Sequence, residues 1–284
     1  MSLVPALPPC RVCVVTGSRA EFGLLRCVMD AIRAHESLEL RVVVTGTHLL
    51  GPAETWREVG EAYEISEKVE MQREGELGRV SDARALGRGV EGMTAAFEQL
   101  GVDWVVVLGD RIEAFAAASA ASIGGYALAH IHGGDRAEGV ADEAMRHAIT
   151  KLAHLHLTAT TRSAERIIRM GEAAERVIVT GSPAIDGLDG VRAMTESEAD
   201  GLFGGVPGAV VLHHPCGLAE QDERAWAQAV VEGVGECVGD RTVLVLSPNR
   251  DPGREAVVAV LRGAVESHGW NWAEHMARDR FVGL

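Results

Sequence analysis

The sequence has little of what marks several large classes of protein. Only 4% of its 284 residues are aromatic, and 41 acidic residues against 27 basic ones give a net charge of −14. An acidic surface repels phosphate backbones, and scarce aromatic rings leave few platforms for stacked bases, so nucleic acid is excluded as the main partner. No apolar run approaches the ~20 residues of a membrane helix, and the first residues lack a signal-peptide pattern. We therefore expect a cytoplasmic protein with no membrane partner.

Cysteine and glycine patterns exclude two further classes. The five cysteines have no framework spacing, and Cys10 and Cys13 lack the second pair or nearby histidine that would complete a zinc site. Cys13 lies inside the apolar run RVCVVTG, so we interpret it as a buried strand residue in a reducing compartment. A G-x-G-x-x-G motif is absent, so a dinucleotide cofactor is not supported. We predict no metal and no cofactor.

Short β-branched runs alternate with helix-like segments along the chain. The runs are RVCVVTGS, LRVVVTGT, DWVVVLGD, ALAHIHGG, HLHLTATT, RVIVTGSP, AVVLHHPC and TVLVLSPN. Each has the length of a strand buried on both faces, and the alternation with helices is typical of parallel βαβ units. We predict an α/β protein of two Rossmann-like domains with doubly wound sheets. Their ranges are 1–185 and 186–284, with the boundary in the Gly- and Asp-rich segment 181–194.

Most of these predicted strands end in glycine, histidine, serine or aspartate. Ligands of open parallel sheets bind beyond the carboxyl ends of the strands, so we expect these residues on one rim. In VVTGSRAEFG, Gly17 precedes a helix whose first turn favours an anion, and Arg19 could bind phosphate or pair with Glu21 or another carboxylate. Asp110 at the end of DWVVVLGD could act in catalysis or cap the following helix.

The stretch HIHGGDRAEGVADEAMRHAITK is the richest in ionisable groups. It holds His130 and His132 in the strand, Asp142 and Glu143 at the start of the next helix, and His147 one turn later. Neighbouring groups of this kind transfer protons, because they push each other's pKa values apart. Helix capping is the plain alternative, and a metal site built from histidine and aspartate is another.

Several motifs together resemble the UDP-N-acetylglucosamine 2-epimerases. The motifs VTGSRAEFGLL, LGDRIEAFAAASAA, HIHGGDRAEGVADEAMRHAITKLAHLH, RSAERIIRMGE, GSPAIDGL, HHP and SPNRDPG occur in the family's order over almost the whole chain. The resemblance is greatest to the hydrolysing branch, which makes N-acetylmannosamine (ManNAc) or a related sugar for sialic-acid-type pathways. It implies two Rossmann-like domains of the GT-B type with a UDP-sugar in the cleft between them, and a homo-oligomer, either a dimer or a tetramer.

The resemblance also implies a reaction. A base removes the proton at sugar C2 while UDP leaves C1, and water then adds to the resulting glycal to release the free 2-epimer, without a redox cofactor or an obligatory metal. The catalytic positions that it implies are Asp110, His132, Asp135, Asp142 and Glu143. The substrate- and nucleotide-binding positions are Arg19, Ala20, Arg111, Ser182, His214 and Asn249.

Three departures from the family pattern leave alternatives open. His132 stands where several relatives have glutamate, and Asp135 where glutamate is common, so the proton assignments stay open, and so does a diacetamido-sugar substrate. The sequence stops at RDRFVGL, where the family continues with a Gly-Asn-Ser-Ser loop, so we expect an incomplete second domain with an exposed sheet edge. The alternatives are a non-hydrolysing epimerase that returns UDP-ManNAc and a truncated UDP-sugar-binding protein without turnover. A retaining glycosyltransferase is an analogy of fold alone.

Overall fold

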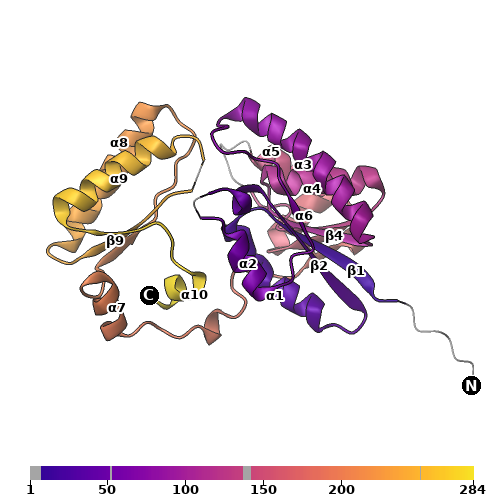
Figure 1. Cartoon of the computed structure of the whole chain (residues 1–284), viewed down its shortest axis with the longest axis horizontal. Coiled ribbons are helices and arrows are strands. Elements are labelled where there is room, and N and C mark those ends of the chain that lie inside the picture. The colour runs from indigo at the N-terminus through magenta and orange to yellow at the C-terminus, as the bar shows by residue number, and fades with distance from the viewer. Residues whose placement is uncertain (1–7, 52, 137–141, 250) are drawn as a thin grey trace, which may run out of the picture. The chain divides into compact units, whose positions relative to one another are not determined.

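The computed structural model describes residues 8–51, 53–136, 142–249 and 251–284 (Figure 1). The chain forms two compact units, Met1–Asp186 and Gly187–Leu284, and each is built on its own parallel sheet. The predicted α/β class with parallel sheets is therefore confirmed. The two units are described separately below.

The first unit contains a seven-stranded sheet in the order β3-β2-β1-β4-β5-β6-β7, and every neighbouring pair is parallel. This order places the topological switch point between β1 and β4, which is where doubly wound sheets bind their ligands. The strands are β1 (Cys10–Thr16), β2 (Leu38–Thr45), β3 (Glu67–Val69), β4 (Trp104–Leu108), β5 (Ala127–Ile131), β6 (Leu155–Thr158) and β7 (Val177–Val179).

Helices cover both faces of this sheet (Figure 1). One core packs side chains of α3, α4 and α5, including Phe97 and Ile149, against the sheet, and the other packs α1 and α2, including Phe22 and Val59. The helices are α1 (Arg19–Ala34), α2 (Trp56–Ala62), α3 (Arg79–Leu100), α4 (Ile112–Gly124), α5 (Asp142–Leu152) and α6 (Thr161–Arg169).

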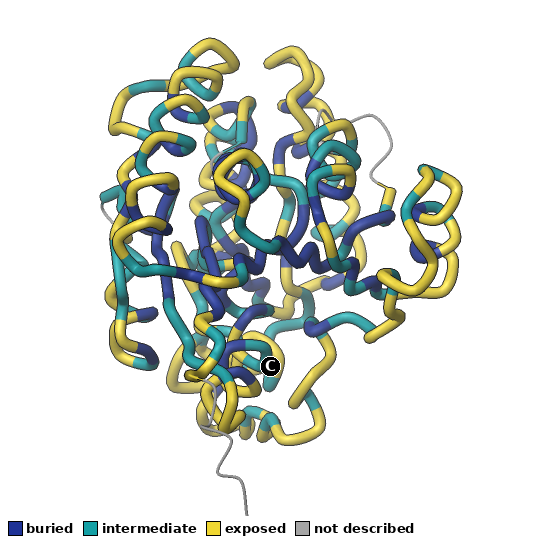
Figure 2. Tube along the Cα trace, turned by 90° about the vertical axis from the view of Figure 1, so that its right-hand side faces the viewer, coloured by how far each residue is buried: buried dark blue, intermediate teal, exposed yellow. Residues whose placement is uncertain are grey.

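Strand β1 shows why the apolar runs of the sequence are continuous. Successive side chains of a strand point to opposite faces, and both faces of this sheet are covered. Val12 and Val14 accordingly join the core under α1, whereas Cys13 and Val15 join the core under α3 and α4. Burial raises the pKa of the Cys13 thiol, which is free, as expected of a plain core residue. Figure 2 shows the same division, with buried strands and exposed outer turns of helices.

The second unit has a three-stranded parallel sheet in the order β10-β9-β8. In its core, Val231 of α8 and Leu261 of α9 pack against strand residues such as Val243, and Trp270 belongs to the same cluster. The strands are β8 (Ala209–Val211), β9 (Val243–Leu246) and β10 (Asn271–Ala273), and the helices are α7 (Glu196–Phe203), α8 (Glu220–Val238), α9 (Arg254–His268) and α10 (Arg278–Gly283).

Two strands, β3 and β10, were not expected from the sequence. Each has only three residues, Glu-Lys-Val and Asn-Trp-Ala, without the β-branched run that identifies the other strands. Their composition does not favour a strand, and they are extended because they pair with β2 and β9. The first sheet therefore has seven strands where the sequence predicts six.

Candidate functional site

The parallel strands of the first unit bring several predicted site residues to one edge of the sheet. Since all strands of the sheet run the same way, the turns that leave their carboxyl ends share that edge. The turn after β1 leads to Arg19 and the exposed Ala20, the turn after β4 carries Asp110 and Arg111, and the turn after β5 carries His132 and Asp135. Ser182 follows β7.

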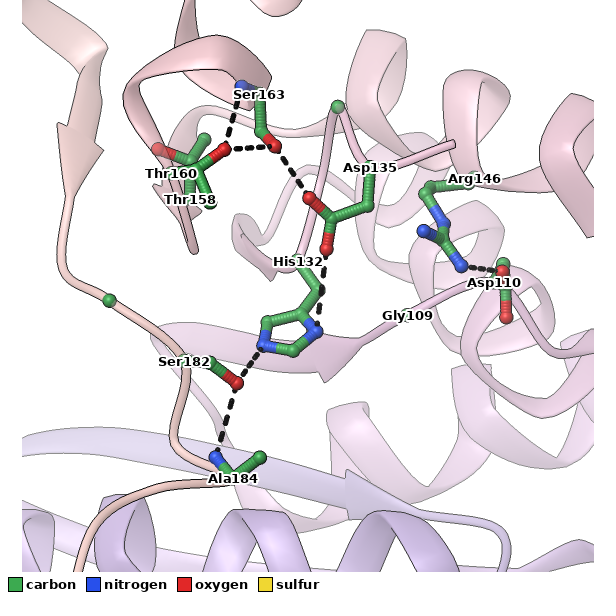
Figure 3. Close-up of polar contacts among 12 residues, drawn as sticks. Gly109, Asp110, His132, Asp135, Arg146, Thr158, Thr160, Ser163, Ser182 and Ala184 are labelled. Atoms are coloured by element: carbon green, nitrogen blue, oxygen red, sulfur yellow. Dashed lines mark hydrogen bonds and ion pairs between the residues drawn. The ribbon is translucent and has the colours of Figure 1, made fainter. Parts of the chain in front are cut away.

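Asp110 forms an ion pair with Arg146 of α5 (Figure 3). Both side chains are largely shielded from solvent, at 16% and 13% exposed, so the bond is charge-assisted and weakly screened. The N-cap position of α4 is Arg111, so Asp110 is not the residue that caps this helix. A carboxylate held by an arginine in this way is an oriented acceptor at the end of β4.

His130 is a buried structural histidine. Its Nε2 lies 2.8 Å from the carbonyl oxygen of Gly109 and its Nδ1 3.2 Å from the hydroxyl of Thr150. Burial lowers its pKa to about 3, so the ring is neutral and donates from Nε2 to the carbonyl. His130 therefore holds the turn after β4 through Gly109, and its buried ring does not reach the solvent-exposed edge of the sheet.

His132 adopts an unusual backbone conformation for a residue with a side chain. Its φ is +64°, in the left-handed region that costs a non-glycine residue roughly 1–2 kcal/mol. This conformation ends β5 and turns the imidazole toward Ser182, whose Oγ lies 2.9 Å from Nε2 (Figure 3). Such strain persists where the surroundings hold it, and it is concentrated at functional sites.

Asp135 lies on the other side of the same imidazole. Its Oδ2 is 3.6 Å from Nδ1 of His132, and its Oδ1 accepts a 2.5 Å hydrogen bond from Ser163, beside the N-cap Thr160 of α6. A carboxylate beside Nδ1 favours the tautomer protonated there, which leaves Nε2 as the basic nitrogen facing Ser182.

The protonation state of His132 follows from opposing influences. Burial lowers its pKa from the ordinary value, and Arg146 adds to this effect, whereas the charges of Asp135 and Asp110 oppose it. The net shift is downward, so the ring is neutral at neutral pH. A neutral imidazole with an oriented Nε2 is a competent general base.

The start of α5 carries the remaining predicted acidic residues. Glu143 Oε1 lies 3.7 Å from Nε2 of His147, one turn later, and 3.6 Å from Nε of Arg136. Asp142 is the first residue of the helix, but its side chain lies outside the described part of the structure. The structure therefore places Glu143 in a local ion-pair cluster and gives no contact for Asp142.

The turn after β1 has the build of an anion site. Ser18 caps α1 by accepting from the amide of Glu21 at 3.4 Å, and Arg19 is the first helical residue. Burial lowers the pKa of Arg19, and Glu58 is the carboxylate whose charge acts against that shift. Glu21 instead accepts a 2.8 Å bond from the amide of Gly17, so of the carboxylates considered for Arg19 from the sequence, Glu21 or another, the structure favours another, Glu58.

In the second unit, the two predicted nucleotide contacts are neighbours. Nδ1 of His214 accepts a 3.1 Å bond from the backbone amide of Asn249, and the Asn249 side chain donates to Asp251 at 2.6 Å. Buried Glu223 organises the loop after His214 by accepting from the amides of Cys216 and Leu218 at 2.8 and 2.9 Å.

Three buried glutamates, Glu21, Glu113 and Glu223, are the polar residues that the sequence interpretation missed. Each lies in the first turn of a helix that follows a strand, where a carboxylate is ordinarily an exposed partner of the helix dipole. For two of them a signal lay in nearby glycines: a Cβ on Gly17 or Gly46 would clash with Glu113, and a Cβ on Gly253 would clash with Glu223.

Comparison with known proteins agrees with these features. Residues 30–284 match the family model described as UDP-N-acetylglucosamine 2-epimerase. The chain belongs to this family. It is 30% identical over 277 residues to the UDP-N,N'-diacetylbacillosamine 2-epimerase (hydrolyzing) of Legionella pneumophila, covering 96% of the chain and 72% of the relative.

Two further relatives come from one organism. The UDP-N-acetylglucosamine 2-epimerase of Neisseria meningitidis is 28% identical, with 88% of this chain and 66% of that protein covered. The crystal structure of a UDP-GlcNAc 2-epimerase from the same organism, bound to UDP-GlcNAc, superposes with a TM-score of 0.78 at 19% identity, over 96% of this chain and 74% of that one. At that identity the likeness shows the fold.

The chain spans only part of its relatives, from 45% to 72% of the length of the first four. Every helix in the described residues is too short or too polar to span a lipid bilayer. Side chains suited to metal binding do not gather in groups of three or more within the same residues.

Proposed function

We propose that this chain acts on a UDP-acetamido sugar as a hydrolysing 2-epimerase, in the compartment expected from its composition, the cytoplasm. The observation that carries the proposal is the neutral imidazole of His132, held between Asp135 and Ser182, with the Asp110–Arg146 pair beside it. The relative of 30% identity and a second of 31% are both named as hydrolysing 2-epimerases, which supports the same branch.

The proposed reaction has two stages. In the first, a base removes the C2 proton, the electron pair of that C–H bond forms the C1=C2 double bond, and the C1–O bond to UDP breaks. In the second, water adds its oxygen to C1, and C2 receives a proton from the opposite face. The products are UDP and the free 2-epimer.

The residues fit the charges that develop in these stages. Nε2 of His132 is the basic nitrogen at the edge, and the Asp110 carboxylate is the oriented acceptor next to it. Asp142 and Glu143 remain proposed proton carriers at the start of α5. Arg19 and Arg111, beside the N-terminal turns of α1 and α4, would stabilise the negative charge on departing UDP, with Ala20 and Ser182 lining the same edge. His214 and Asn249 are the proposed nucleotide contacts of the second unit.

Product analysis in heavy water tests the proposal. The chain is incubated with UDP-GlcNAc and, in parallel, with UDP-N,N'-diacetylbacillosamine, the substrate named for one relative. Release of UDP and a free sugar deuterated at C2 is expected, and whichever donor turns over identifies the acetamido sugar. A product in which the epimerised sugar is still attached to UDP would show the non-hydrolysing reaction instead, consistent with the relative named simply as a UDP-GlcNAc 2-epimerase. Heat of UDP binding without any product would identify a binding protein.

A further inference from the structure

Two glutamates form a buried acid pair beneath the turn after β1. Glu21 comes from the first turn of α1 and Glu113 from the first turn of α4, and their residues are 7% and 0% exposed. Both reach Gly17: its amide donates to Glu21 Oε2, and its Cα faces the Cβ and Cγ of Glu113. Two carboxylates therefore meet at one glycine, in a dry place where charge is costly.

Two glycines beside the pair leave the space that the Glu113 side chain fills. A Cβ on Gly17 would lie 2.4 Å from Cγ of Glu113, and a Cβ on Gly46, at φ +62°, would lie 2.6 Å from Cγ and from Oε1 of the same residue. The Thr-Gly motifs that end β1 and β2 thus leave the passage through which the Glu113 side chain runs. The conformation of Gly17 does not itself require glycine, whereas the positive φ of Gly46 also favours glycine there.

The pair is tied to the proposed phosphate-binding arginine. Oε2 of Glu113 lies 3.4 Å from Nε of Arg111, whose side chain is 33% exposed, and Oε1 accepts a 2.7 Å bond from the amide of Gln72. Arg111 is the charged group that faces the pair, and Gln72 and the Gly17 amide are its neutral partners. The buried carboxylate of Glu113 contacts Nε of Arg111 and so orients the guanidinium, while the two terminal nitrogens are not used by this contact.

We propose that Glu113 is a positioning residue, which acts with Glu21 as a single-proton acid pair to hold Arg111 and the Gly17 turn in the geometry that binds the diphosphate of the UDP-sugar. This inference rests on the proposed function. It assigns a role to two residues that take no direct part in the chemistry.

The unpartnered oxygens of these carboxyl groups support one proton on the pair. Glu21 Oε1 and Glu113 Oε2 are both buried without a hydrogen-bond partner in the described structure, and a protonated carboxyl group supplies a donor that two carboxylates lack. Burial, and then the charge of Glu113, raise the pKa of Glu21 to about 8, while Arg111 and the Gly17 amide oppose the shift. Proton sharing of this kind is expected where two carboxyl groups occupy one site.

The test compares Glu21→Gln and Glu113→Gln with an exposed control on α3, Glu91→Gln. E21Q imitates the protonated carboxyl and retains the acceptor for Gly17, so its affinity for UDP at about pH 7 should equal that of the wild type. E113Q removes the anion that pairs with Arg111, so UDP should bind about tenfold more weakly, a change of about 1.4 kcal/mol in binding free energy. Titration calorimetry with UDP measures both.

The pH dependence separates positioning from a merely structural role. Between about pH 7 and about pH 9 the wild type and E91Q should lose UDP affinity as the second carboxylate ionises, whereas E21Q should show a smaller loss. Thermal midpoints should differ between these variants as well, over a lower pH range. A raised folded pKa means that stability is lost as pH rises from the ordinary carboxyl value to about 8, and E21Q lacks that decline.

Each outcome decides between the proposals. Equal UDP affinity of E113Q and E91Q, or identical pH profiles of E21Q and the wild type, would overturn the role of the acid pair. If E113Q does not fold, the E21Q profiles decide alone, since that variant retains its hydrogen bond. If the wild type and E91Q do not bind UDP, the proposed function fails together with the role of Arg111, while the thermal profiles still show whether the pair shares a proton.

Discussion

Replacing Gly17 by alanine tests directly whether Glu113 dictates the sequence of the turn after β1. An added Cβ would lie 2.4, 2.5 and 3.0 Å from Cγ, Cβ and Cδ of Glu113, where carbon atoms prefer about 3.5–4.0 Å. Two of these atoms are at the root of the side chain, so rotation of its end brings no relief, and the backbone of the turn or of α4 must shift. Overpacking of this kind costs about 1–3 kcal/mol.

A double-mutant cycle isolates this contact. Glu113→Gly is the matched change, because alanine would keep the Cβ that lies 2.5 Å from the added atom. Glu113→Gly alone removes all three clashing atoms, leaves Gln72 without its acceptor and Arg111 without its carboxylate, and puts a glycine into the first turn of α4, at a cost of about 1–3 kcal/mol. If the contact is responsible, Gly17→Ala should cost almost nothing in the Glu113→Gly background, giving a coupling free energy of about 1–3 kcal/mol. The free energies come from urea unfolding, with hydrogen exchange of the β1 and β4 amides as a readout specific to this unit.

Additive effects would refute this reasoning. If Gly17→Ala destabilises the protein equally with and without Glu113, the glycine is required for the turn itself and leaves no passage for the carboxylate. The backbone at Gly17 is not in the left-handed region, so a conformational requirement for glycine does not mimic the coupling.

Three further predictions use other parts of the structure. In α3, Gly87→Ala should stabilise the protein by about 0.5–1 kcal/mol, because no atom lies near the added Cβ. Gly89→Ala should destabilise it, because a Cβ there would lie 2.9 Å from a Cβ of α4. Urea unfolding shows whether each change raises or lowers the free energy of unfolding. Asp135→Asn removes a charge that raises the pKa of His132, so NMR titration of that ring should show a lower pKa, and the acid limb of the pH–rate profile should shift the same way; an unchanged titration would contradict the contact. Glu223→Ala leaves two loop amides without their acceptor and should cost the second unit about 2–3 kcal/mol, and an unchanged thermal midpoint would contradict its organising role.

The fold was predictable from the sequence to the extent that its strands are buried on both faces. Runs such as WVVVL in β4 predict a buried strand from the sequence alone, because a strand covered by helices on both sides needs apolar residues at every position. The short strands β3 and β10 were missed because partner strands, rather than their own composition, hold them in the sheets.

The site was predictable in its residues but not in its connections. Motif order pointed to Asp110, His132 and Ser182, yet nothing in the sequence indicates that an imidazole at a left-handed position spans 50 residues to meet Ser182. Tertiary ion pairs such as Asp110 with Arg146 depend on the packing of α5 beside α4 and β5. Periodicity locates elements, whereas these contacts depend on tertiary packing.

The acid pair bears on how a chain of net charge −14 could bind a diphosphate at all. Arg111, which we propose to bind phosphate, and Arg146 each have a carboxylate partner, so these two pairs carry no surplus positive charge. If Glu21 were also ionised beside Arg111, the local charge would be negative and would repel UDP. A proton held on the pair at neutral pH removes that excess, and Arg19, on which the charge of Glu58 also acts, lies at the same turn. Anion affinity that declines in alkaline solution, and declines less in E21Q, is therefore the behaviour that this balance of charges requires.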